Sequence, residues 1–303
     1  MDRGKAYENY HEKKEHTTVE FPYNTYLCTI PLDFLEVPFH WHEEAELIVI
    51  KKGKGVVLVD LCPYEVAAGD IVFVLPGQLH AIRQRGGCVM EYENILFRSE
   101  LLEGSGVDLC SSHFLQPLFS GLVNFSPYIG EHCTYYETVS GCIAQIDSVC
   151  SRRPFGYQIA VKGFLFQLLF ALLTNHTMIQ ETGSQTGHRK ALEKVKLVLA
   201  YVQRHYGRAI SIEEIAGVCH YSKSHFMKFF KEAMGVGFIQ YLNDYRLGIA
   251  SQRLLSGQEG ILEVAGSCGF ENLSYFNRLF KRKYGMSPGQ FRNQYVSRKD
   301  NRL

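Results

Sequence analysis

Four side chains in the first third of the sequence have the types and spacing of a metal-ligand set. His40, His42 and Glu46 follow the pattern H-x-H-x3-E, and His80 lies further along the chain. The first three occupy even-numbered positions, so on one continuous strand they lie on the same side. Imidazole and carboxylate groups that converge inside a small barrel can bind divalent Zn, Mn, Fe or Ni.

Two other interpretations of the same four residues stay open. Imidazole and carboxylate groups pair well with hydroxyls, so they can instead contact an organic effector such as a sugar. The histidines can also be a structural group that satisfies its own hydrogen bonds. The residue types do not name the ligand.

Short β-rich runs surround these residues between positions 21 and 97. Turn-forming pairs separate the runs, among them Ala68-Gly69-Asp70, Pro76-Gly77 and a turn at Lys52–Gly55. The expected strands are Ala45–Ile50, Gly55–Leu61, Asp70–Leu75 and Val89–Phe97. Many short strands at this spacing predict a sandwich or barrel.

Residues 261–292 form the second stretch with chemically useful spacing. A short apolar helix is expected before Gly269, a longer helix over 273–284, and a further helix from Ser287-Pro288. The longer helix carries polar and cationic groups on its outer face, which suit base edges and phosphates. These residues are Asn272, Ser274, Asn277, Arg278, Lys281 and Arg282. The segment alone also fits an ordinary helical hairpin with a solvated face.

An internal repeat favours a helix-turn-helix. Residues 212–241 match residues 261–291 at the core and turn positions and differ at the exposed ones, as two readers of different bases do. In the first copy, the early exposed positions are Lys223, Ser224, His225 and Lys228. A long helix over 238–255 joins the copies. It could hold the two recognition helices about 34 Å apart, in successive major grooves. His220 replaces Gly269 in the first turn, and histidine tolerates the left-handed conformation better than most residues.

The last 115 or so residues resemble the DNA-binding domain of the AraC/XylS family of bacterial transcription regulators, through G-F-E-N-x-S-Y-F-N-R-x-F-K-R-x-x-G-x-S-P-x-x-F-R. The H-x-H-x3-E and G-D-x4-P-x-G-x2-H segments resemble both motifs of cupin domains, the usual sensory half of such regulators. The resemblance implies a homodimer that contacts RNA polymerase and activates transcription. It places base-facing positions at Ser224, Met227, Lys228, Asn272, Leu273, Ser274 and Arg278.

Charge separates the two halves of the chain. Residues 189–303 hold 19 Lys and Arg against 9 Asp and Glu, a net charge of +10, whereas the remaining residues hold 13 and 22, a net charge of −9. An acidic half joined to a basic half suggests that only the basic half touches nucleic acid. The charged N-terminus has no apolar core of a signal peptide. The nine cysteines include no C-x-x-C pair and suggest reduced thiols in a cytoplasmic protein.

The sequence therefore predicts a multidomain β plus α protein with four parts. Residues 1–105 form a cupin-like effector-sensing barrel behind a mobile arm over 1–20, and 106–176 a helical dimerisation segment. Residues 177–190 are the linker, and 191–297 the all-α domain with two helix-turn-helix modules. In the second part, helices are expected over 135–149 and 155–174. The second of them packs under the barrel as core, or also builds the dimer interface, as the family resemblance implies. The apolar run 164–173 is too short to span a membrane.

We expect a sequence-specific, non-enzymatic DNA-binding regulator that activates transcription under control of a small-molecule effector in the barrel. One alternative is a metal-sensing regulator, in which the metal is the signal. Another is a metal-dependent cupin enzyme fused to a DNA-binding domain. Turnover of a small substrate would single out the enzyme, and operator affinity that depends on metal alone would single out the sensor.

Overall fold

A computed structural model describes residues 20–33, 36–103, 108–175, 177–178, 183–256 and 259–293. The chain divides into two compact units with the boundary between Gln185 and Thr186. We call the described residues up to 185 the barrel unit and those from 186 to 293 the helical unit. Residues 1–19 of the predicted arm lie outside the described residues.

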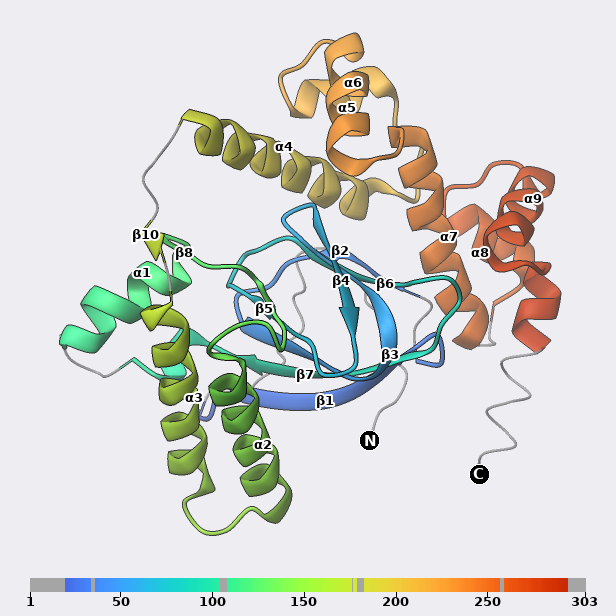
Figure 1. The fold of residues 1–303 in the computed structure, drawn as a ribbon. Coiled ribbons are helices and arrows are strands. Elements are labelled where there is room, and N and C mark those ends of the chain that lie inside the picture. The colour runs from blue at the N-terminus through green and yellow to red at the C-terminus, as the bar shows by residue number, and fades with distance from the viewer. Residues whose placement is uncertain are drawn as a thin grey trace. The chain divides into compact units, whose positions relative to one another are not determined.

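Antiparallel strands build the barrel unit (Figure 1). β1 pairs with β7, β7 with β3, β3 with β5, and β5 with β9. The second half of β3 pairs with β4 and β6, and β6 also pairs with β2. The strand bounds are β1 Tyr23–Ile30, β2 Val37–His40, β3 Ala45–Val59, β4 Cys62–Ala67, β5 Ile71–Val74, β6 His80–Gln84, β7 Met90–Phe97, β8 Val123–Asn124, β9 Tyr128–Ile129 and β10 Thr177–Met178, which pairs with β8.

Strand β3 differs from the prediction. Residues 52–55 do not form a turn, because β3 runs through them as one strand of 15 residues. Lys51 is an extra residue between the pairs Ile50↔Tyr92 and Lys52↔Glu91, so the strand bends at a bulge instead of reversing. The reversal occurs at Asp60-Leu61, both with positive φ, which the prediction had placed in a strand.

The bulge also changes which side chains face the barrel interior. Before it, the even-numbered residues Glu46, Ile48 and Ile50 point inward, while Ala45, Leu47 and Val49 join the outer core. After it, the odd-numbered residues Gly55, Val57 and Val59 are the buried ones. Both faces of this strand are therefore buried before the bulge, and one face is buried after it.

Helices cover the outer face of the sheet. The short ones are η1 Ser99–Leu101, η2 Ser111–Leu115 and α1 Gln116–Phe119; the long ones are α2 Tyr136–Arg152 and α3 Tyr157–Thr174. The last two match the predicted pair and form an antiparallel hairpin (Figure 1). Both share one apolar core with the sheet.

Helix α3 is longer than the apolar run counted in the sequence. By length and composition it is the one helix among the described residues that could cross a membrane. Six of its residues, including Val161, Leu165 and Leu168, are buried against the sheet and α2, as in the core helix of a globular unit. The opposite face of α3 is exposed and carries Ile159, Phe166 and Phe170 beside polar residues such as Lys162 and Gln167.

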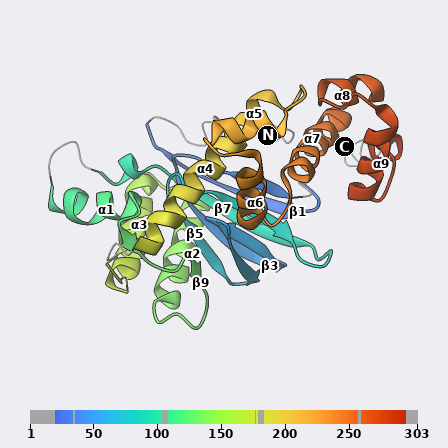
Figure 2. The same cartoon turned by 90° about the horizontal axis from the view of Figure 1, so that it is seen from above.

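The helical unit contains the predicted repeat. Its helices are α4 Gly183–His205, α5 Ile212–Val218, α6 Lys223–Met234, α7 Phe238–Ser256, α8 Ile261–Ser267 and α9 Leu273–Tyr284, and residues 288–293 are again helical. Figures 1 and 2 show α7 between the pair α5–α6 and the pair α8–α9. The linker prediction was wrong over 183–190, because α4 begins at Gly183 and not at residue 192.

The helix caps and turns of the two repeats have the conformations that the sequence predicts. Ser211 and Glu214 form a capping box on α5, and the Ser222 hydroxyl accepts a hydrogen bond from the His225 main-chain N–H at the start of α6. His220 adopts a φ of 55°, so the histidine turn keeps the left-handed conformation found at Gly269, where φ is 81°. The inner face of α9 consists of Phe276, Leu279 and Phe280, and all three are buried.

Candidate functional sites

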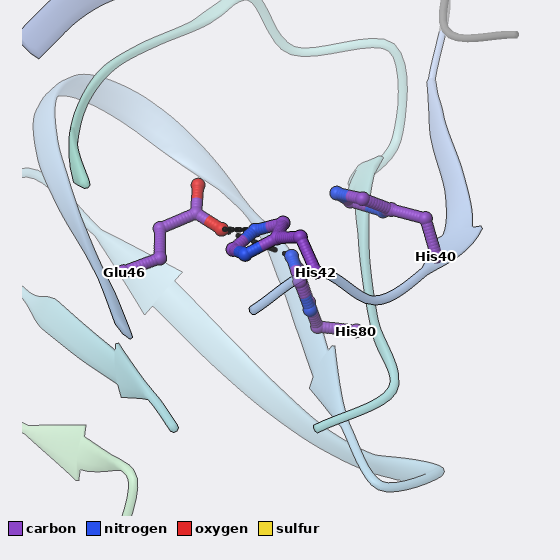
Figure 3. A group of neighbouring side chains, drawn as sticks. All are labelled: His40, His42, Glu46 and His80. Carbon is purple, nitrogen blue, oxygen red and sulfur yellow. Dashed lines mark hydrogen bonds and ion pairs between the residues drawn. The ribbon is translucent and has the colours of Figure 1, made fainter. Parts of the chain in front are cut away.

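The structure brings the four predicted ligands together inside the barrel (Figure 3). His40 ends β2, His42 follows it, Glu46 lies in β3 and His80 begins β6. One ligand atom from each lies within 4.8 Å of all the others, and the side chains are at most 3% exposed. Glu46 Oε2 is 3.1 Å from His42 Nε2 and 2.9 Å from His80 Nε2.

Main-chain carbonyls fix the tautomer of all three histidines. The Nδ1 atoms of His40, His42 and His80 lie 3.0, 3.0 and 2.9 Å from the carbonyls of Pro38, Glu44 and Gln78. A carbonyl only accepts, so each Nδ1 donates and each Nε2 of a neutral ring is left with a lone pair. A histidine that ligates a metal through Nε2 is held in this way.

This arrangement leaves a surplus of acceptors at the centre of the cluster. If the rings are neutral, two Nε2 lone pairs face the carboxylate oxygen of Glu46 with no hydrogen between them. Only an extra proton or a cation turns these contacts into attractive ones. The donor set therefore fits a divalent metal.

Burial and mutual contacts also control ionisation in the cluster. Burial lowers the pKa of His40 well below its usual value, with further lowering by His80 and His42. Burial by itself would raise the pKa of Glu46, but its close contacts with the His42 and His80 rings outweigh burial and hold that pKa well below its usual value, which requires a proton or a cation on the imidazole side. The neutral imidazole and the carboxylate are the forms that bind metals.

The reason for the convergence differs from the sequence argument. His40, His42 and Glu46 do not share a continuous strand, because a bend at residues 43–44 separates β2 from β3. The alternation still puts even-numbered residues inward, and it includes Glu44, which the sequence analysis missed. Glu44 is buried, with Oε2 3.6 Å from His42 Nδ1 and Oε1 accepting from Arg98 Nε at 3.1 Å.

The inward face of β7 carries two more buried polar groups. The Tyr92 hydroxyl and Asn94 Oδ1 have no hydrogen-bond partner within the described chain, although both side chains are at most 1% exposed. Cys28 pairs with Tyr92 across β1 and β7, but a thiol is only a weak hydrogen-bonding group. Leaving such a group unsatisfied costs about 1–3 kcal/mol.

The predicted DNA contacts lie on the outer faces of α6 and α9. In α6, all five are exposed: Lys223, Ser224, His225, Met227 and Lys228. In α9 and its cap, four are exposed and Asn277 is half-buried: Asn272, Leu273, Ser274, Asn277 and Arg278. Each helix thus exposes the positions at which the two internal repeats differ and buries the positions at which they match.

Two of these residues have local partners that limit their roles. Asn272 caps α9, with its Oδ1 accepting from the Tyr275 main-chain N–H at 2.9 Å. Lys223 forms an ion pair with Glu213 of α5. Arg278 remains exposed, with its guanidinium 5.3 Å from the centre of the Tyr275 ring, one turn earlier. A guanidinium that stacks on an aromatic ring still has its N–H groups available as hydrogen-bond donors.

Comparison with known proteins agrees with these features. The chain matches a family model described as an AraC-like ligand binding domain over residues 35–169 and a helix-turn-helix domain over 215–294. An uncharacterized HTH-type transcriptional regulator of Bacillus subtilis (strain 168), YdeC, is 25% identical over 93% of this chain and 95% of its own. The HTH-type transcriptional activators RhaS and RhaR of Klebsiella pneumoniae are 24% and 25% identical, each over 84% of this chain and 87% of theirs.

A ligand-binding barrel joined to a double helix-turn-helix defines a DNA-binding transcription regulator controlled by a small ligand. This chain belongs to the AraC/XylS family of such regulators, as its motifs predict. Its relatives are named as regulators and not as enzymes.

Proposed function

We propose that this protein activates transcription as a homodimer and that a divalent metal in its barrel controls operator binding. The observation that carries the metal proposal is the set of three Nε2 atoms and one carboxylate in a buried cluster whose Nδ1 atoms all donate to carbonyls. Ligands of a four-coordinate metal lie about 3.4 Å apart. The separations in the cluster lie on both sides of this value, from 2.9 Å between Glu46 and His80 up to 4.8 Å.

Elemental analysis tests the metal proposal. Untagged protein is purified without chelator or added metal, and Mn, Fe, Ni and Zn are measured by mass spectrometry. We expect near-stoichiometric metal in the wild type and none in His42→Ala. The matched control is His113→Ala, which removes an exposed histidine from the same unit and should leave the metal in place.

The role of the metal is then tested by measuring affinity for an operator that the protein has selected from random DNA. Operator affinity that falls on metal removal and returns on reloading supports metal control. A barrel that holds no metal, even after incubation with each of the four ions, contradicts it. Metal with turnover of a small substrate would instead favour the enzyme alternative.

A second candidate is a polar organic effector, either alone or on the metal. The unsatisfied Tyr92 hydroxyl and Asn94 carbonyl favour it, because a ligand with hydroxyl groups, such as a sugar, would supply the missing partners. A thermal-shift screen of sugars and hydroxy acids, with and without metal, tests this candidate. Stabilisation that is lost in Asn94→Leu supports the contact.

The homodimer proposal rests on the exposed face of α3. Ile159, Phe166 and Phe170 are 77%, 40% and 69% exposed, and Gly163 lies between the first two. Their spacing of four, three and four residues is that of a two-helix seam. A second copy of the same face is the simplest partner for such a stripe. RNA polymerase is the proposed partner for activation, and the cytoplasm is the proposed location, because DNA and polymerase are there.

A further inference from the structure

We propose that Arg246 of α7 is a positioning residue that fixes the two helix-turn-helix modules relative to each other and thereby sets the spacing of DNA sites the protein accepts. The Arg246 side chain is 8% exposed. Its Nε donates to the Tyr206 carbonyl at 2.8 Å and its Nη2 to the Arg208 carbonyl at 2.6 Å. Burying a guanidinium costs free energy unless its N–H groups are hydrogen-bonded. Breaking these two bonds in the folded protein would therefore be strongly unfavourable.

The two carbonyls belong to a loop that is anchored to the first module. Arg208 forms an ion pair with Glu214 of α5 and donates to the Tyr201 hydroxyl of α4 at 2.9 Å. Hydrogen bonds from Arg208 and Tyr201 lower the pKa of Glu214 to about 2. Glu214 also completes the cap of α5, so the loop over 206–209 moves with the first module.

The same guanidinium contacts the turn of the second module. Its Cζ lies 5.8 Å from the centre of the Phe270 ring. A Cβ on Gly269 would lie 2.4 Å from the Tyr206 carbonyl oxygen and 2.8 Å from Arg246 Nη2. The loop of the first module, α7 and the turn of the second module therefore meet at one point.

This junction explains the departure between the two repeats. Both turns require positive φ, and the first accommodates His220 there. The second turn is pressed against Tyr206 and Arg246, so only glycine fits at position 269. The glycine is needed for contact between the modules as well as for the turn itself.

Helix α7 is tied to the second module by further bonds. Asn243 Nδ2 donates to the Tyr275 hydroxyl at 3.1 Å, and the Tyr284 hydroxyl donates to the Leu247 carbonyl at 3.1 Å. These bonds hold α9 on α7, while Arg246 holds the first-module loop on both. Removing Arg246 should free one module to shift against the other while each keeps its own core.

The test measures the affinity for DNA as a function of the distance between the two subsites. The wild-type protein first selects its operator from random DNA, and variants of that operator then gain or lose one base pair between the two subsites. Each added base pair moves a subsite by about 3.4 Å and rotates it by roughly 35°. We expect the wild type to lose at least roughly tenfold in affinity at either altered spacing. Arg246→Met should bind all three spacings within a few-fold of one another.

The control is Arg282→Met, which removes an exposed arginine from α9 and should weaken all spacings equally. Thermal unfolding checks that each variant is folded. If Arg246→Met does not fold, Arg208→Gln loosens the same loop and leaves the buried guanidinium in place. Affinity lost by the same factor at every spacing in the folded variant would overturn the proposal and make Arg246 a stability residue only.

Discussion

At the scale of single residues, Arg278 is the strongest candidate for reading a base. It is exposed on α9 and stacked over Tyr275, and arginine recognises guanine through two parallel hydrogen bonds. Arg278→Ala should cost roughly 1–3 kcal/mol of specific binding and relax the preference at one base position. Lys281→Ala is the comparison, because a phosphate contact weakens binding to every sequence alike. Selection of binding sites from random DNA by both variants measures this, and equal losses on all sequences would make Arg278 a phosphate contact.

The sequence predicts which residues form the barrel cluster but not what holds them. Residue types and even spacing were enough for His40, His42, Glu46 and His80, because alternation survives the bend between β2 and β3. The carbonyls that fix the histidine tautomers come from Pro38 in β2 and from Glu44 and Gln78 in connecting segments, and no residue pattern specifies their positions. Glu44 had a usable signal, since it shares the even-numbered alternation.

At the scale of elements, the exposed stripe of α3 has a direct test. Phe170→Glu should convert the proposed homodimer to a monomer, because it places a charge in an apolar contact. Gln158→Glu adds the same charge to an exposed polar position of α3 and should leave the dimer intact. Light scattering after gel filtration reports the mass of each variant. A dimer that survives Phe170→Glu and Ile159→Glu would show that the interface lies elsewhere.

Element boundaries were predicted well where local chemistry decides them. Caps and glycines fix both ends of α6 and α9, and these match the repeat. The continuous strand β3 was missed because Lys52–Gly55 has the composition of a turn. Its path is decided by pairing with β7 and by the bulge at Lys51, which are long-range features. The early start of α4 was missed because residues 183–190 carry no apolar period.

At the scale of the whole molecule, sensing and DNA binding belong to different compact units. A fragment over 183–303, which keeps α4 complete, should bind the selected operator without any response to metal or effector. The full-length protein should bind a two-site operator more tightly than the fragment, because a dimer engages both sites together. Fluorescence anisotropy with one-site and two-site DNA measures both effects. A fragment that is folded but does not bind would mean that binding requires the dimer.

The bulge in β3 has a consequence for tolerance to insertions and deletions. Deleting Lys51 would remove the bulge and leave Glu46, Val57 and Val59 on the inner face, whereas deleting or adding one residue elsewhere between Glu46 and Val57 would turn either Glu46 or the pair Val57 and Val59 to the opposite face. Substitutions along β3 act locally, whereas such a change of length outside the bulge moves side chains of the barrel lining to the outer face of the sheet. By contrast, Gly86-Gly87 lies in the turn between β6 and β7, where an added Cβ would meet no atom within 4 Å. Natural length variation in the barrel is therefore expected at this turn and not within β3.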